Sequence, residues 1–155
     1  MRRDVAVAVN AGRMRRARGV MVLALTAAAL LAAPPVALGQ GDQSAAAASD
    51  PILQQLAAFR RDDYDAAYEF ASSQIRDKFD RTAFERMVKS GYPEIARSTF
   101  AAVAEARLVA KDHAIVRVKI QGANGKGIEA LYDMVLEDRG WRIDGVVARP
   151  DPGQV

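Results

Sequence analysis

The side chains that join an aromatic ring to a polar end are the strongest candidates for chemistry in this chain. They are four tyrosines and one tryptophan, namely Tyr64, Tyr68, Tyr92, Tyr132 and Trp141. In a fold with an internal cavity, they would bind a small ligand, and a buried hydroxyl beside an acid such as Asp144 would polarise a carbonyl group. Alternatively, they are core residues whose polar ends stay near water, as is common for these two residue types.

One group of acids has the spacing to meet a hard cation on one side of a helix. It consists of Asp62, Asp63, Asp65 and Glu69. The alternating acids and central glycine of a calcium-binding loop are missing, and acids at the start of a helix are expected from the helix dipole alone. We therefore predict neither a metal site nor a cofactor.

The remaining reactive residue types occur without the partners that their chemistry requires. His113 is the only histidine, and the chain has no cysteine, so a zinc site is not expected. Ser72 and Ser73 lack the flanking glycines of a nucleophile elbow. We expect both serines to form local hydrogen bonds with the backbone near a helix end.

Three helices are predicted to precede any strand. The first begins at Ser49 or Asp50, with Pro51 in its first turn, and has an apolar stripe through Ile52, Leu56 and Phe59. The second spans residues 59–75, with Asp62 or Asp63 as its cap, and its apolar stripe has the period of a helix. The third follows Asp80, covers residues 81–91 and ends at Gly91.

The second half of the chain has the two-residue period of strands. Residues 115–121 and 128–137 alternate apolar and polar side chains around a turn at Asn124 and Gly125, and residues 141–147 form a last strand. Residues 100–109 are ambiguous by propensity. Three helices followed by about four antiparallel strands predict a single α+β domain over residues 50–149, in which the helices cover one face of a curved sheet. Residues 150–155 are expected to be a proline-rich tail outside the sheet.

The first 39 residues have the features of a secretory signal peptide. Six arginines precede an apolar run over residues 20–33, and Ala37 and Gly39 place small residues where a signal peptidase cleaves. We predict cleavage before Gln40, a periplasmic or secreted protein, and a flexible lead-in over residues 40–49. An uncleaved membrane anchor is the alternative, but the apolar run is short of the roughly 20 residues that span a bilayer. Met14 is an alternative start to Met1.

Cleavage would also remove the basic character of the chain. The full sequence has 22 Lys and Arg against 19 Asp and Glu, and loss of six arginines and Asp4 leaves 16 against 18. The remaining charges are interspersed, so nucleic-acid binding is not expected. The lack of cysteine excludes both disulfides and lipid attachment through a cysteine, and we expect no membrane association after cleavage.

Several short motifs resemble a family of small exported bacterial proteins known as a domain of unknown function. They lie at residues 59–63, 66–75, 87–93 and 141–145, the last reading Trp-Arg-Ile-Asp-Gly. The order of elements is similar to the nuclear-transport-factor-like, ketosteroid-isomerase-like superfamily. That resemblance implies a cone of helices against a curved sheet, with a pocket inside. It implies no reaction, because the superfamily includes enzymes, carriers and dimerisation modules.

These observations favour a non-catalytic periplasmic domain that binds either a small apolar ligand or a protein partner. A partner would use the outer sheet face that carries Arg117, Lys119 and Glu129. The first alternative is a small enzyme of isomerase or lyase type with a tyrosine and an acid in the pocket. The second is a dimerisation scaffold in which a second copy of the chain covers the sheet.

Overall fold

The computed structural model describes residues 40–154, so the predicted signal peptide lies outside the described residues. The chain divides into two units, residues 1–35 and 36–155, and every described residue belongs to the second. No helix within residues 40–154 has the length and apolar character needed to cross a membrane. The helices are α1 (Gln40–Ala47), α2 (Asp50–Arg60), α3 (Tyr64–Tyr68), α4 (Ser73–Lys78), α5 (Arg81–Gly91) and α6 (Pro93–Ala96). The strands are β1 (Ser98–Ala110), β2 (His113–Gly122), β3 (Gly127–Glu137) and β4 (Gly140–Pro150), followed by a 3₁₀ turn, η1 (Pro152–Gln154).

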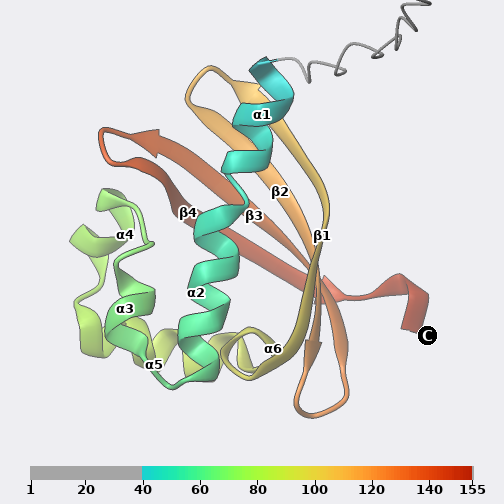
Figure 1. Cartoon of the computed structure of the whole chain (residues 1–155). Coiled ribbons are helices and arrows are strands. Elements are labelled where there is room, and N and C mark those ends of the chain that lie inside the picture. Colours follow the sequence, from blue (N-terminus) through green and yellow to red (C-terminus); the bar gives the residue numbers. More distant parts are fainter. Residues whose placement is uncertain (1–39, 155) are drawn as a thin grey trace, which may run out of the picture. The chain divides into compact units, whose positions relative to one another are not determined.

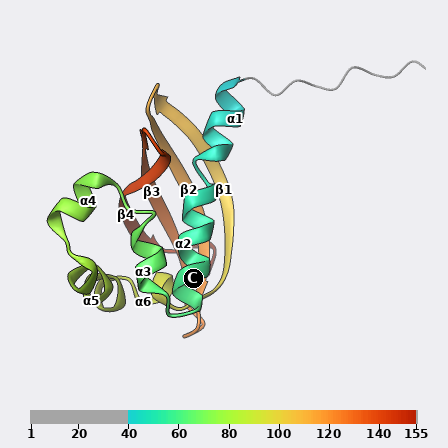
Figure 2. The same ribbon diagram turned by 60° about the vertical axis from the view of Figure 1, so that its left-hand side comes forward.

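The sheet is an antiparallel meander in the order β1-β2-β3-β4, and helices α2 to α6 lie against one of its faces (Figures 1 and 2). Side chains at alternate positions of the two central strands point into the core, since successive residues of a strand face opposite sides. On β2 these are Ala114, Val116, Val118 and Ile120; on β3 they are Ile128, Ala130, Tyr132 and Met134. The ambiguous run over residues 100–109 is part of β1. The predicted α+β architecture is confirmed.

Helix α2 forms the centre of the helical layer. Its stripe of Ile52, Leu56 and Phe59 is buried, and the ring of Phe59 lies 6.3 Å from that of Phe84 on α5. Burying three large apolar side chains stabilises the fold by roughly 5–9 kcal/mol before entropic costs. Helix α2 therefore joins the sheet and α5 in one hydrophobic core. Its apolar stripe was predicted from the sequence.

The second predicted helix, residues 59–75, is divided in the structure. It consists of α3, capped by the carboxylate of Asp63, and α4, capped by the hydroxyl of Ser72. Between them the backbone at Ala71 forms a parallel bridge with Ile143 of β4. The amide of Ser72 donates to the carbonyl of Ile143 at 2.8 Å, and the amide of Ile143 donates to the carbonyl of Phe70 at 2.9 Å. These bonds to the sheet edge replace the intrahelical bonds that a continuous helix would make.

Residues 40–49 do not form the predicted flexible lead-in. Most of this segment is helix α1, which contacts β1. Its alanines explain the difference, because alanine has the highest helix propensity and its small side chain allows close packing. Ala45 and Ala48 are both buried.

The last strand also extends further than predicted. Arg149 and Pro150 remain in β4, opposite Glu129 and Ile128 of β3. Proline is tolerated there because it is the final residue of an edge strand, where no further ladder bond from its nitrogen is needed. The tail outside the sheet is therefore shorter than predicted.

Candidate functional site

The helical layer and the sheet form a cavity of about 310 Å³ that is partly open to solvent. Its lining comes from α2, α4, α5, α6, β3 and β4 and from the segments that connect the helices. The apolar lining residues are Phe59, Ala71, Ile75, Phe79, Phe84, Met87, Val88, Ile95, Ile143, Gly145 and Val146. Three polar residues complete it, namely Gln55, Tyr92 and Tyr132.

Among the described tyrosines, Tyr132 is the one whose hydroxyl is fully buried and makes no hydrogen bond to any described residue. Its side chain is 1% exposed and rises from the central strand β3. Burial raises the pKa of this phenol well above its ordinary value, so the group keeps its proton at neutral pH. Buried polar groups in folded proteins nearly always have a partner, and those without one need an explanation.

The other two polar lining residues are tied to the backbone. The hydroxyl of Tyr92 donates to the carbonyl of Val146 at 3.3 Å. The side-chain nitrogen of Gln55 donates to the carbonyl of Ala67 at 3.1 Å, which joins α2 to α3. Both bonds hold the cavity wall in place. The amide of Gln55 has a second N–H and an oxygen acceptor besides the group used in this bond.

The lining contains neither an acid nor a base among the described residues. Asp144, the acid considered for an isomerase-type site, is half-buried and accepts a hydrogen bond from the hydroxyl of Ser72 at 2.6 Å. It occupies a bulge in β4, because Ile143 and Gly145 pair with consecutive residues of β3 and Asp144 has no partner there. The bulge therefore directs this carboxylate to the junction of α3 and α4.

Of the five predicted ligand-binding residues, Tyr92 and Tyr132 line the cavity, whereas Tyr64, Tyr68 and Trp141 are buried outside its lining. Tyr64 packs its ring 5.3 Å from that of Phe59 and 4.5 Å from the amine of Lys89. Trp141 is buried near the start of β4.

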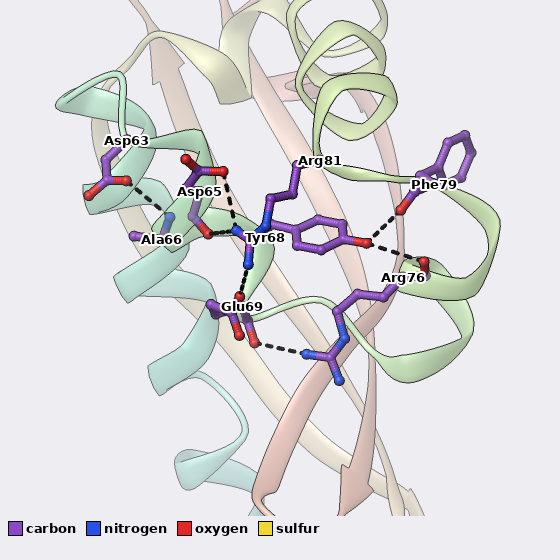
Figure 3. Close-up of polar contacts among 8 residues, drawn as sticks. All are labelled: Asp63, Asp65, Ala66, Tyr68, Glu69, Arg76, Phe79 and Arg81. Carbon is purple, nitrogen blue, oxygen red and sulfur yellow. Dashed lines mark hydrogen bonds and ion pairs between the residues drawn. The ribbon is translucent and has the colours of Figure 1, made fainter.

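Tyr68 holds two helices together, as Figure 3 shows. Its hydroxyl lies 2.6 Å from the carbonyl oxygen of Phe79 and 3.2 Å from that of Arg76, at the C-terminal end of α4. Arg81 of α5 lies over the ring, 5.0 Å from its centre, and bonds to Asp65 and Glu69. This polar cluster fixes α4, whose Ile75 lines the cavity.

The other residues considered for chemistry have structural partners. Asp63 caps α3, and no group of side chains within residues 40–154 is arranged to hold a metal ion. His113 bonds to Asp112, and that hydrogen bond raises the pKa of the imidazole. Ser72 caps α4 by accepting from the amide of Ile75, as expected for a serine near a helix end. Ser73 differs from the expectation, because its hydroxyl donates to the distant carboxylate of Glu137 and not to the local backbone.

The charged side chains of the outer sheet face pair mostly with one another. Arg117 forms an ion pair with Glu105, and Arg149 forms one with Glu129. Lys119 lies 3.8 Å from Asp151. A protein partner or a second copy on this face stays a prediction.

Gln55 was not predicted as a lining residue. A signal for it exists, since Gln55 lies on the stripe of Ile52, Leu56 and Phe59 at helical spacing, where a polar residue is unusual. Phe84, Met87 and Val88 have the spacing of one helix face, but such a pattern does not separate core packing from cavity lining.

Comparison with known families shows a match over most of the chain. Residues 42–155 match the model of a family described as a domain of unknown function, DUF4864. A search of curated proteins found no match.

Solved structures with similar folds come from several bacteria. The chain is similar to an NTF-2 like protein of unknown function from Silicibacter pomeroyi, at 20% identity over 71% of this chain and 98% of that chain, with a TM-score of 0.52. It is also similar to a domain of unknown function with a cystatin-like fold from Nostoc punctiforme, at 15% identity over 74% and 80%, with a TM-score of 0.53. An NTF2-like protein of unknown function from Shewanella baltica matches at 14% identity over 74% and 99%, with a TM-score of 0.52. At these identities the similarity shows the fold alone, and the predicted cone of helices on a curved sheet is confirmed.

Proposed function

Because the chain belongs to the DUF4864 family, a domain of unknown function with an NTF2-like fold, we propose a function from its cavity: non-catalytic binding of a small apolar ligand. The observation that carries this proposal is the cavity of about 310 Å³ with a mainly apolar lining. Protein interiors are normally close-packed, so an apolar space of this volume between the helices and the sheet is a candidate ligand site.

The lining favours binding over catalysis. An isomerase or lyase of the type considered above needs an acid or base within reach of the substrate. None of the described residues that line the cavity is an Asp, Glu, His, Lys or Arg, and Asp144 is bonded to Ser72. A tyrosine alone polarises a carbonyl but supplies no group to move a proton from carbon.

The proposal includes export to the periplasm or beyond. Its support is the arginine-rich, apolar and small-residue pattern of residues 1–39. A carrier or sensor of apolar molecules in that compartment would sample ligands that cross the outer membrane or leave the inner one.

The proposal can be tested with N-phenyl-1-naphthylamine, an uncharged dye that fluoresces in apolar surroundings. Val146 lines the cavity, whereas its neighbour Val147 is 67% exposed on the other face of β4. Val146→Phe would fill part of the cavity, and Val147→Phe is the matched control. We expect the wild-type protein and Val147→Phe to bind the dye at one site, and Val146→Phe to lose at least roughly tenfold in affinity.

Thermal melts establish that both variants are folded before titration. Equal dye binding by all three proteins would place the dye on the surface and would refute a ligand site in the cavity. Absence of binding by the folded wild-type protein would refute it as well.

A further inference from the structure

The cavity also indicates which class of ligand it takes. Building on the proposed binding function, we propose that the ligand is an uncharged, mainly apolar molecule with one oxygen atom that accepts a hydrogen bond from the hydroxyl of Tyr132. A carbonyl, ether or alcohol oxygen supplies the same acceptor. The hydroxyl would then gain the partner that the protein itself does not provide.

The position of Tyr132 explains why the protein provides no acceptor. Its cross-strand neighbours are Val116 on β2 and Val146 on β4, and the next inward-facing residues along β3 are Ala130 and Met134. Valine and alanine have no hydrogen-bonding side-chain atom, and the methionine sulfur is only a weak acceptor. Backbone carbonyls of a central strand are already used in its two ladders. None of these strand neighbours offers the hydroxyl a good acceptor, and the proposal assigns that role to a ligand.

Two other tyrosines contrast with Tyr132. The hydroxyls of Tyr68 and Tyr92 both have backbone carbonyls as acceptors. A phenylalanine at position 132 would fill the same space without leaving a buried donor unpaired, and it would be the better choice if the position were only structural. An oxygen atom of a ligand would give the hydroxyl of Tyr132 its partner.

Charge and size limit the ligand further. An ionised carboxylate or amine in the cavity would lose its hydration and find no counter-charge in the lining, so charged ligands are excluded. A dry cavity of about 150 Å³ accommodates benzene in a well-studied case. The present cavity of about 310 Å³ suits a molecule of about two fused rings.

A matched set of bicyclic probes tests the proposal. Tetralin is the hydrocarbon, 2-tetralone has the same skeleton with one carbonyl, and 1,2,3,4-tetrahydro-2-naphthoate carries a negative charge. Affinities would be measured by isothermal titration calorimetry at pH 7.5 on the wild-type protein, on Tyr132→Phe and on Tyr68→Phe. The last variant removes a tyrosine hydroxyl outside the cavity and is the control.

We expect the wild-type protein to bind 2-tetralone roughly three- to tenfold more tightly than tetralin, the range of one net hydrogen bond. Tyr132→Phe should weaken only 2-tetralone and remove that preference, while Tyr68→Phe should keep it. The naphthoate should bind at least roughly tenfold more weakly than tetralin. Without ligand, Tyr132→Phe should melt at or above the wild-type temperature, because it loses an unpaired donor.

Other outcomes would overturn the proposal in distinguishable ways. Equal affinity of the wild-type protein for tetralin and 2-tetralone would refute the role of Tyr132 and leave apolar binding in place. A preference that persists in Tyr132→Phe would show that another group binds the oxygen. If the naphthalene dye binds in the cavity and neither tetralin nor 2-tetralone binds, the ligand class is refuted. If none of them binds, the proposed function is refuted too.

Discussion

At the scale of single residues, the partner of a polar group decides what that group does. Tyr68 and Tyr132 are the same residue type and are both buried. Tyr68 donates to the carbonyl of Phe79, so its hydroxyl contributes to the fold, and its loss should destabilise by about 1 kcal/mol. Tyr132 has no partner among the described residues, so its hydroxyl adds no hydrogen bond to the fold.

Glu137 gives a residue-scale prediction about pH. Burial raises the pKa of its carboxyl, but hydrogen bonds from the amide and hydroxyl of Ser73, with Arg76 nearby, outweigh that effect and the pKa is lowered. A carboxylate with a lowered pKa in the folded state stabilises the protein above its unfolded pKa. That stability is lost as the pH falls through the folded value.

Glu137→Gln keeps the shape and removes the charge. Its stability deficit against the wild-type protein, at most about 1 kcal/mol, should be constant from pH 7 to about 5 and should shrink as the pH falls below the ordinary value of 4.5. Urea unfolding of both proteins across this range measures it. A deficit that stays the same at pH 3 would contradict the assignment to charge.

At the scale of elements, strand β4 connects the helices to the sheet. It pairs with β3 on one side and receives the bridge from Ala71 on the other. Trp141 is the first buried residue of β4, and its side chain points toward the core. Trp141→Ala should therefore cost about 3–5 kcal/mol of unfolding free energy, measured by denaturant titration. A loss below about 1 kcal/mol would show that the ring is not part of the core.

The elements also show what the sequence can predict. Strands β2 and β3 followed from alternation, and α2 from its apolar stripe, because one buried face gives a clear local period. The run that forms most of β1 was ambiguous. The stripe through Tyr64, Tyr68 and Ile75 is real, yet it belongs to two short helices. The break between α3 and α4 depends on a backbone hydrogen bond between Ser72 and Ile143, which are far apart in the chain. A local sequence pattern cannot predict such a bond.

The candidate site was predictable to a similar extent. The search for aromatic residues with polar ends identified Tyr92 and Tyr132 among its candidates, and both line the cavity. Whether a hydroxyl has an acceptor depends on its cross-strand neighbours, and those depend on register. The sequence therefore indicates which tyrosines are candidates, while the structure separates Tyr132 from Tyr68.

At the scale of the whole molecule, the described fold does not need the predicted leader. The core is built from residues 45–143, and the family match begins at residue 42. Cleavage before Gln40 would leave α1 intact, because α1 begins at that residue. The fold and the cleavage site predicted from the small residues at positions 37 and 39 are thus compatible.

This compatibility gives a prediction about the mature protein. Expressed in a Gram-negative host, the chain should be recovered from the periplasmic extract with Gln40 as its first residue, as read by intact-mass and N-terminal peptide mass spectrometry. Ala37→Lys puts a long charged side chain where the peptidase requires a small one, so it should accumulate as a membrane-bound precursor. The same change at an exposed position of α1, Ala47→Lys, leaves the leader untouched and should not alter processing. A precursor retained by the wild-type chain would instead support the uncleaved anchor.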